Sequence, residues 1–196
     1  MTKGRLEAFS DGVLAIIITI MVLELKVPHG DDWAALTSLW PVFVSYVLSF
    51  TYIGIYWNNH HHLIAASRHI DGSIMWANLH LLFWLSLTPF VTGWMGENHF
   101  APLPTGLYGF VLLMAGIAYQ ILQVRILAGE PASSALRTEI GSDLKGKLSL
   151  LFYIAGSVIS SVIPWLAWAL FAFVAIMWLV PDRRIERALG QGKAAE

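Results

Sequence analysis

The chain has 196 residues, of which 57% are hydrophobic and only 13% are charged, and its mean hydropathy is +0.63. Soluble domains have about 45–50% apolar and about 25% charged residues, so the composition is typical of an integral membrane protein. The formal net charge of −1 argues against a basic protein that binds nucleic acid. The sequence contains no cysteine, which excludes disulfides, thiolate metal sites and a cysteine nucleophile.

Six apolar segments follow one another along the chain, each near the length that crosses a hydrocarbon core of about 30 Å. We expect an all-α integral membrane protein that forms a single unit over residues 1–196, with transmembrane helices at approximately 5–26, 39–63, 73–95, 104–128, 146–163 and 165–182. The last two divide a long apolar stretch at Pro164. One long helix kinked at this proline is the alternative.

The distribution of basic residues predicts the orientation in the membrane. With a cytoplasmic N-terminus, eleven of the 12 Lys and Arg residues lie on the inner side, and Lys26 alone lies outside. This asymmetry agrees with the positive-inside rule for six crossings with both termini cytoplasmic. Five crossings would place the basic C-terminal tail outside. We therefore expect a multi-pass protein of the cell (plasma or inner) membrane.

The first segment, RLEAFSDGVLAIIITI, joins a polar start to an apolar helix. At 100° per residue, one stripe of this helix contains Phe9, Gly12, Ile16, Thr19, Ile20, Leu23 and Val27, and Asp11 points away from it. An ionisable group inside a membrane normally has a partner. Candidate partners are the residues Trp57 to His62 at the end of the second segment and Asn78 and His80 in the third.

These groups predict a polar network between the first three helices, close to the inner side of the membrane. Its expected members, grouped with the neighbouring motif residue Phe9, are Arg5, Ser10, Asp11, Trp57, His60, His61, Asn78 and His80. A simple N-terminal cap is the other use for Ser10 and Asp11, but they lie a turn or more inside the apolar run. We expect the network to be structural rather than catalytic.

Two motifs resemble those of a known family. Arg5, Phe9, Ser10 and Asp11 form the Arg-x-x-x-Phe-Ser-Asp pattern that is the hallmark of the transmembrane protein 175 family of potassium channels, and WNNHHHL is similar to its Trp-x-x-His-His signature. The resemblance implies a homotetramer with one six-helix unit per chain, in which four first helices surround a central pore. It further implies that Ile16 is the constricting position, with Thr19, Ile20 and Leu23 on the next turns.

The resemblance implies a passive, potassium-permeable cation channel and not an enzyme, and the stripe and the polar network are consistent with it. No Thr-Val-Gly-Tyr-Gly-like segment is present, so we expect no filter of backbone carbonyls and only modest selectivity for K⁺ over Na⁺. A ring of Ile16 side chains would form a hydrophobic gate that closes by dewetting. Thr19 hydroxyls would replace part of the ion's hydration shell, and Glu24 near the outer mouth would concentrate cations.

The expected partners are K⁺ and other monovalent cations, the lipid bilayer and further copies of the chain, with no nucleic acid and no cofactor besides permeant K⁺. Two alternatives remain. A secondary ion transporter would favour broken helices and charged residues at the midplane, which the first segment lacks. A metal-dependent membrane enzyme would use the His60–His62 run, yet adjacent helical histidines diverge by about 100°, so no metal site is expected.

Overall fold

A computed structural model describes residues 2–130 and 143–179. All regular structure in these two ranges is helical, as the composition and the apolar segments predict. The helices are α1 (Lys3–Leu23), α2 (Trp33–Ser38), α3 (Trp40–Ala66), α4 (Gly72–Ser86), α5 (Thr88–Glu97), α6 (Pro102–Ala128), α8 (Leu144–Ile159) and α9 (Pro164–Leu179). Residues 180–182 of the last predicted helix lie outside the described residues.

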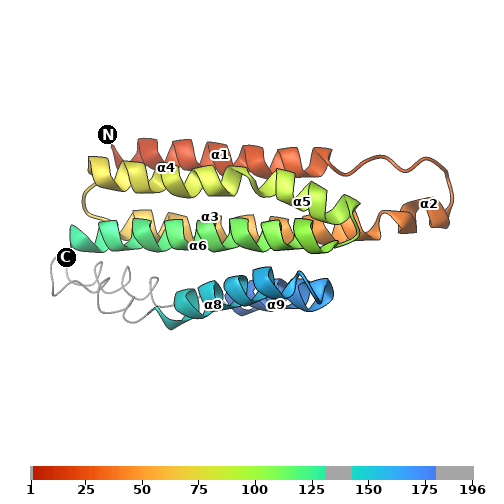
Figure 1. Ribbon diagram of the computed structural model, residues 1–196. Coiled ribbons are helices and arrows are strands. Elements are labelled where there is room, and N and C mark those ends of the chain that lie inside the picture. Colours follow the sequence, from red (N-terminus) through yellow and green to blue (C-terminus); the bar gives the residue numbers. More distant parts are fainter. Residues whose placement is uncertain (1, 131–142, 180–196) are drawn as a thin grey trace.

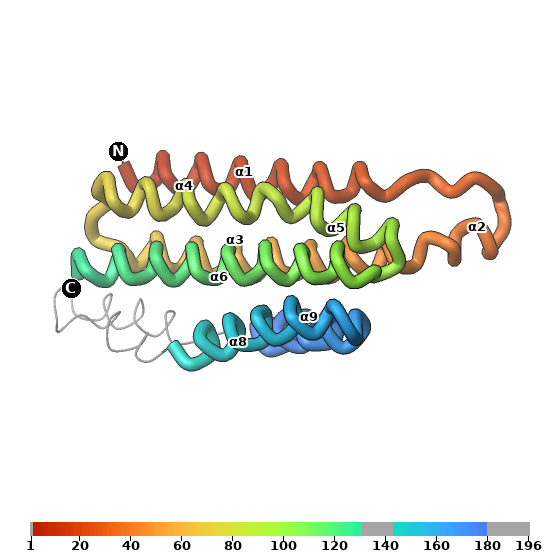
Figure 2. The backbone as a smooth tube through the Cα atoms, in the orientation of Figure 1, coloured from red at the N-terminus to blue at the C-terminus, as the bar shows by residue number. Residues whose placement is uncertain are grey.

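The long helices lie side by side in an elongated bundle (Figure 1). One side of the bundle holds α1 with α4 and α5, the middle holds α3 and α6, and the other side holds the α8–α9 hairpin, as the tube in Figure 2 shows. The helix α1 packs against α3, α4 and α5. Its position at the edge of the bundle leaves the rest of its surface without a partner among the described helices.

Three segments among the described residues are both long enough and apolar enough to cross a membrane. They are Lys3–Leu23, Gly72–Glu97 and Pro102–Ala128, and α9 is a shorter apolar helix. The helices α8 and α9 are separate and joined at Ser160–Ile163, so the long apolar stretch is divided next to Pro164, where the sequence predicts a break.

The structure differs from the predicted ranges in several places. The first helix ends at Leu23 rather than at residue 26, ahead of Pro28, which disfavours helical backbone at the residue before it. The third segment is interrupted at Leu87, between α4 and α5, because Pro89 has no N–H to donate to the carbonyl four residues earlier. A short helix, α2, forms in the loop between α1 and α3 and is capped by Asp32, whose Oδ1 accepts from Ala35 N at 2.8 Å.

Candidate functional site

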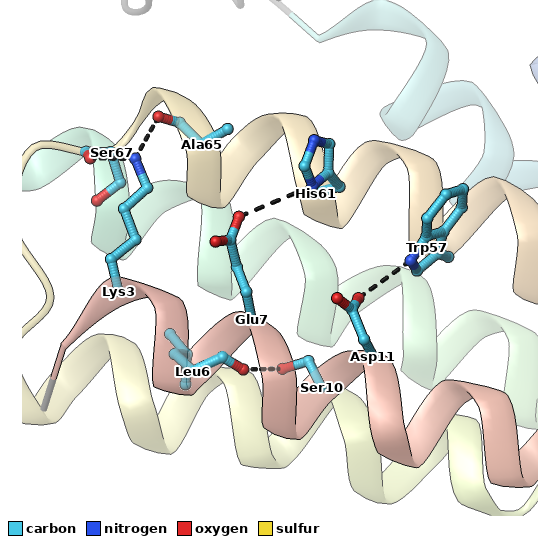
Figure 3. A network of polar contacts seen from close by, with 9 residues as sticks. All are labelled: Lys3, Leu6, Glu7, Ser10, Asp11, Trp57, His61, Ala65 and Ser67. Carbon is cyan, nitrogen blue, oxygen red and sulfur yellow. Dashed lines mark hydrogen bonds and ion pairs between the residues drawn. The ribbon is translucent and has the colours of Figure 1, made fainter.

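Two acidic residues of α1 contact α3 on one face. Asp11 and Glu7 are four residues apart, so they lie one above the other on the helix. The indole Nε1 of Trp57 donates to Asp11 Oδ1 at 3.0 Å, and His61 Nδ1 lies 3.7 Å from Glu7 Oε1. Trp57 and His61 are also four residues apart, and α3 runs antiparallel to α1 (Figure 3). The two helices are therefore joined in register along one line.

The same line of contacts continues to the N-terminus of α1. Lys3, one further turn from Glu7, donates from Nζ to the carbonyl oxygen of Ala65 and to that of Ser67 at 3.1 Å (Figure 3). These carbonyls belong to the C-terminal end of α3, where a cation is favoured by unpaired carbonyls and the helix dipole. We call the contacts of Lys3, Glu7 and Asp11 with α3 the α1–α3 ladder.

A second set of polar contacts is buried between α1, α3 and α4. Asn78 of α4 donates from Nδ2 to Ser10 Oγ at 3.0 Å, and its Oδ1 lies 2.7 Å from Nε2 of His60. Ser10 Oγ donates in turn to the carbonyl oxygen of Leu6 at 2.9 Å. Ser10, His60 and Asn78 are each almost completely buried, so every polar group in this chain of contacts has its partner inside the protein, as buried polar groups require.

The remaining predicted network residues lie apart from these contacts. The Arg5 side chain is exposed and forms no ion pair or hydrogen bond within the described residues. Phe9 is exposed on the opposite side of α1. His80 accepts from Trp84 Nε1 at 2.9 Å, within α4. Sequence reasoning missed Lys3 and Glu7, although the spacing of four residues from Lys3 to Glu7 and from Glu7 to Asp11 places all three on one face of the helix.

The apolar stripe of α1 faces away from both sets of contacts. Ile16 is 59% exposed and Leu23 is 78% exposed, whereas Leu14 and Ile17 on the packed face are 2% and 3% exposed. Thr19 lies in the exposed stripe and donates from Oγ1 to the carbonyl oxygen of Ile16 at 2.9 Å. Because a hydroxyl has one donor and two acceptor lone pairs, this bond leaves the Thr19 oxygen available as an acceptor.

An open groove between α1 and α5 adjoins this stripe. It has a volume of about 640 Å³ and is lined on the α1 side by Ile16, Ile20 and Glu24. The Glu24 carboxylate lies against Gly93 of α5, where a Cβ would come within 3.5 Å of Glu24 Oε2. The C-terminal end of α1 thus carries an acidic group beside α5.

A lysine beyond the end of α1 pairs with the last residue of α5. Lys26 Nζ donates to Glu97 Oε1, and this hydrogen bond, with the charges of Glu97 and Glu24, raises the pKa of Lys26. Both side chains are substantially exposed, so the pair contributes little stability. Within residues 2–130 and 143–179 no group of three His, Asp or Glu side chains could hold a metal ion.

Comparison with known proteins agrees with the two motifs. A family model described as endosomal/lysosomal potassium channel TMEM175 matches residues 5–89. A protein named potassium channel from Chryseobacterium sp. (strain P1-3) is 55% identical over 96% of this chain and 98% of its own length. Another so named, from Streptomyces collinus, is 37% identical over 61% of this chain and 62% of its own.

A solved structure has the same fold. It is the crystal structure of a lysosomal potassium-selective channel TMEM175 homolog from Chamaesiphon minutus, with a TM-score of 0.81 and 28% sequence identity. The match covers 92% of this chain and 97% of that one. The identity of 55% over nearly the full length, together with this structural match, shows that the chain belongs to the TMEM175 family of potassium channels, which are ion channels and not enzymes.

Proposed function

We propose that the chain is one subunit of a homotetrameric, passive, potassium-permeable cation channel with a central pore lined by four copies of α1. The observation that carries the proposal is the exposed apolar stripe with Ile16, Thr19 and Leu23, on a helix whose other faces are bonded to α3 and α4. A stripe held outward at the edge of the bundle is available to meet its copies around a common axis. The naming of the Chryseobacterium relative as a potassium channel supports the same function.

The chemistry of the stripe suits a narrow passage with modest selectivity. A ring of Ile16 side chains excludes water when it is narrow, so it acts as a hydrophobic gate. Thr19 follows one turn later with an oxygen whose lone pairs can replace part of the hydration shell of an ion. A single layer of flexible hydroxyls is a weaker discriminator than stacked rings of backbone carbonyls, so K⁺ is favoured over Na⁺ only modestly.

The position of the proposed pore fits one membrane orientation. With both termini in the cytoplasm of a cell-membrane protein, the α1–α3 ladder lies at the inner end of α1 and Glu24 lies at the outer mouth. The ladder and the buried Ser10–Asn78–His60 contacts then hold the inner half of α1, while Glu24 raises the local concentration of cations outside. The polar residues position the helix, and the stripe meets the ions.

Flux from liposomes that contain the purified protein tests this proposal. We expect K⁺ efflux from the wild type, faster efflux from Ile16→Asn because a polar ring stays wet, and a lower K⁺/Na⁺ ratio in Thr19→Ala. Ile176→Asn is the matched control: Ile176 is 63% exposed and lies on α9, away from α1. It should leave the flux unchanged.

Two results would overturn the proposal. One is the absence of flux from both the wild type and Ile16→Asn in protein that is folded and inserted. The other is a native mass measurement in detergent that finds a stable monomer. Flux that depends steeply on a second ion, and saturates as a carrier does, would instead favour a secondary transporter.

A further inference from the structure

A small cavity lies on the side of the bundle away from α1, between α3, α6, α8 and α9. Its volume is about 40 Å³. The largest part of its wall is aromatic and is formed by Tyr52, Tyr56, Tyr119, Tyr153 and Trp178. None of these residues belongs to the stripe, the ladder or the buried contacts of α1. The proposed ion path therefore makes no use of the cavity.

Two polar groups in the cavity wall have no partner within the described residues. Tyr56 is only 8% exposed, and its hydroxyl forms no hydrogen bond there; neither does the carboxamide of Gln120. By contrast, the Tyr52 hydroxyl donates to the carbonyl oxygen of Phe171 at 2.7 Å, and Trp178 Nε1 donates to Ser149 Oγ at 2.8 Å. A buried polar group without a partner costs free energy, so an occupant that bonds the Tyr56 hydroxyl would be stabilised. Gln120 is partly exposed and offers a further bond to the same occupant.

The cavity wall also carries one ionised group. Asp143 caps α8, and its Oδ1 accepts from Gly146 N at 3.2 Å. A side chain at position 146 would collide with this carboxylate, so the glycine lets Asp143 lie against the first turn of α8. Lys145 Nζ lies 5.8 Å from the centroid of the Trp178 ring, so this ring already has a cation beside it. The Asp143 carboxylate and the faces of the tyrosine rings are the features of the wall that favour a positively charged occupant.

We propose that this cavity binds the primary ammonium group of an amine or of a lipid head group. Such a group has three N–H donors, and the wall offers three matching acceptors in Tyr56 Oη, Gln120 Oε1 and the Asp143 carboxylate. The aromatic faces add cation–π attraction. A water molecule takes about 30 Å³ in the liquid, so a cavity of about 40 Å³ accommodates a compact ammonium head. Ile55 and Leu150 in the same wall provide an apolar surface for a short alkyl tail.

Calorimetric titration of the purified full chain with n-butylammonium chloride tests the site. Titration with sodium chloride is the control for ionic strength, and titration with n-butanol is the control for a neutral molecule with the same alkyl tail. Tyr56→Phe removes the unpaired hydroxyl and no contact within the described residues. Asp143→Asn removes the charge and keeps a good helix cap. Because a hydrogen bond to a charged group is strong, each variant should bind about tenfold more weakly or worse. Tyr46→Phe, a tyrosine outside the cavity, should bind like the wild type.

Reconstitution of the purified protein into vesicles of defined lipid composition distinguishes a lipid head group from a free amine as the source of the ammonium group. If phosphatidylethanolamine is bound, it should raise the melting temperature over phosphatidylcholine in the wild type but not in Tyr56→Phe. If only n-butylammonium shows this pattern, the ligand is a free amine.

Three outcomes overturn the site: no saturable binding, equal binding in both cavity variants, or equal binding of n-butanol. Any of these would leave the cavity with water alone or with non-specific contacts. Binding that is lost in Thr19→Ala and kept in Tyr56→Phe would place the amine in the ion path instead. That result would refute the cavity site while leaving the proposed channel function intact.

Discussion

Trp57 of α3 donates from its indole Nε1 to Oδ1 of Asp11 on α1 at 3.0 Å, and this bond determines which side of α1 faces outward. Ser10, the preceding residue, is directed to Asn78 of α4. Since successive helical residues turn by about 100°, Ile16 lies about 140° from Asp11 and about 120° from Ser10 around the axis. The side of α1 that carries Ile16 therefore faces away from the two helices, α3 and α4, to which these polar contacts are made.

Replacing Trp57 by Phe tests this contact. The substitution keeps an aromatic ring and removes the donor to Asp11, so we expect a loss of about 1 kcal/mol of stability, measured by chemical unfolding in detergent. A double-mutant cycle with Asp11→Asn should give a coupling energy of similar size. Trp76→Phe is the control, because Trp76 is 75% exposed and makes no hydrogen bond within the described residues. Additive effects of Trp57→Phe and Asp11→Asn would contradict the contact.

Asn78 should be more sensitive than either of its partners. Asn78→Ala leaves His60 Nε2 buried without its partner, which costs about 1–3 kcal/mol. It also removes the donor to Ser10 Oγ, which keeps only its bond to the Leu6 carbonyl. Ser10→Ala leaves one N–H of Asn78 without its acceptor but keeps the contact between Asn78 and His60, so its cost should be smaller. Thermal melting in detergent should therefore rank the variants wild type, Ser10→Ala, Asn78→Ala in order of falling stability.

His80→Leu gives the contrast to Asn78→Ala within α4. His80 contacts Trp84 on its own helix and forms no hydrogen bond to a second helix within the described residues, so its replacement should change the melting temperature little. A larger loss in His80→Leu than in Asn78→Ala would mean that the polar contacts between α1 and α4 are organised differently.

The helical class and the family could be predicted because their signals are local. The apolar segments show their length directly in the sequence, and the motif from Arg5 to Asp11 identifies the family. The sequence could also predict that five polar residues lie near one another, because consecutive membrane helices run antiparallel and these residues lie at the same depth. They are Ser10, Asp11, Trp57, His60 and Asn78. In the structure these residues form two separate sets of contacts rather than one network.

Features that depend on exact backbone geometry were not predictable in the same way. Pro89 signals a break, but whether a proline kinks a helix or divides it depends on how neighbouring helices satisfy the freed carbonyl. Lys3 and Glu7 looked like ordinary solvated residues at a helix end, and only the register of α3 gives them partners. The cavity beside Tyr56 requires four helices to meet, so no spacing within one segment points to it.

Close packing between α6 and its neighbours depends on Gly109. A Cβ at this position would overlap the Phe171 ring and the Ser157 hydroxyl. Overpacking of this kind costs about 1–3 kcal/mol, so Gly109→Ala should unfold at a lower denaturant concentration than the wild type. Gly54→Ala is the matched control in α3, where a Cβ meets no atom within 4 Å. It should be neutral or slightly stabilising, since alanine favours a helix over glycine.

The cap of α4 predicts a change of stability in acid. The Ile74 N–H and the Ser73 hydroxyl bond the Asp71 carboxylate and lower its pKa. A lowered pKa stabilises the fold above the ordinary pKa of aspartate, and this contribution disappears as the pH falls through the lowered value. Asp71→Asn keeps a cap without the charge, so melting curves between neutral pH and pH of about 3 should show a smaller acid-induced drop than in the wild type. An equal drop would assign the acid sensitivity to other carboxylates.

Glu24 should influence conduction through its charge alone. If four copies of this carboxylate surround the outer mouth, Glu24→Gln lowers the local cation concentration and reduces K⁺ influx at low ionic strength. The Debye length shortens from about 30 Å at 0.01 M salt to about 8 Å at 0.15 M, so the difference from the wild type should shrink as salt is added. Lys26→Gln is the opposite test, because it removes the positive charge paired with Glu97 and should increase influx at low salt. A salt-independent loss in Glu24→Gln would indicate a structural role for the residue against Gly93 rather than an electrostatic one.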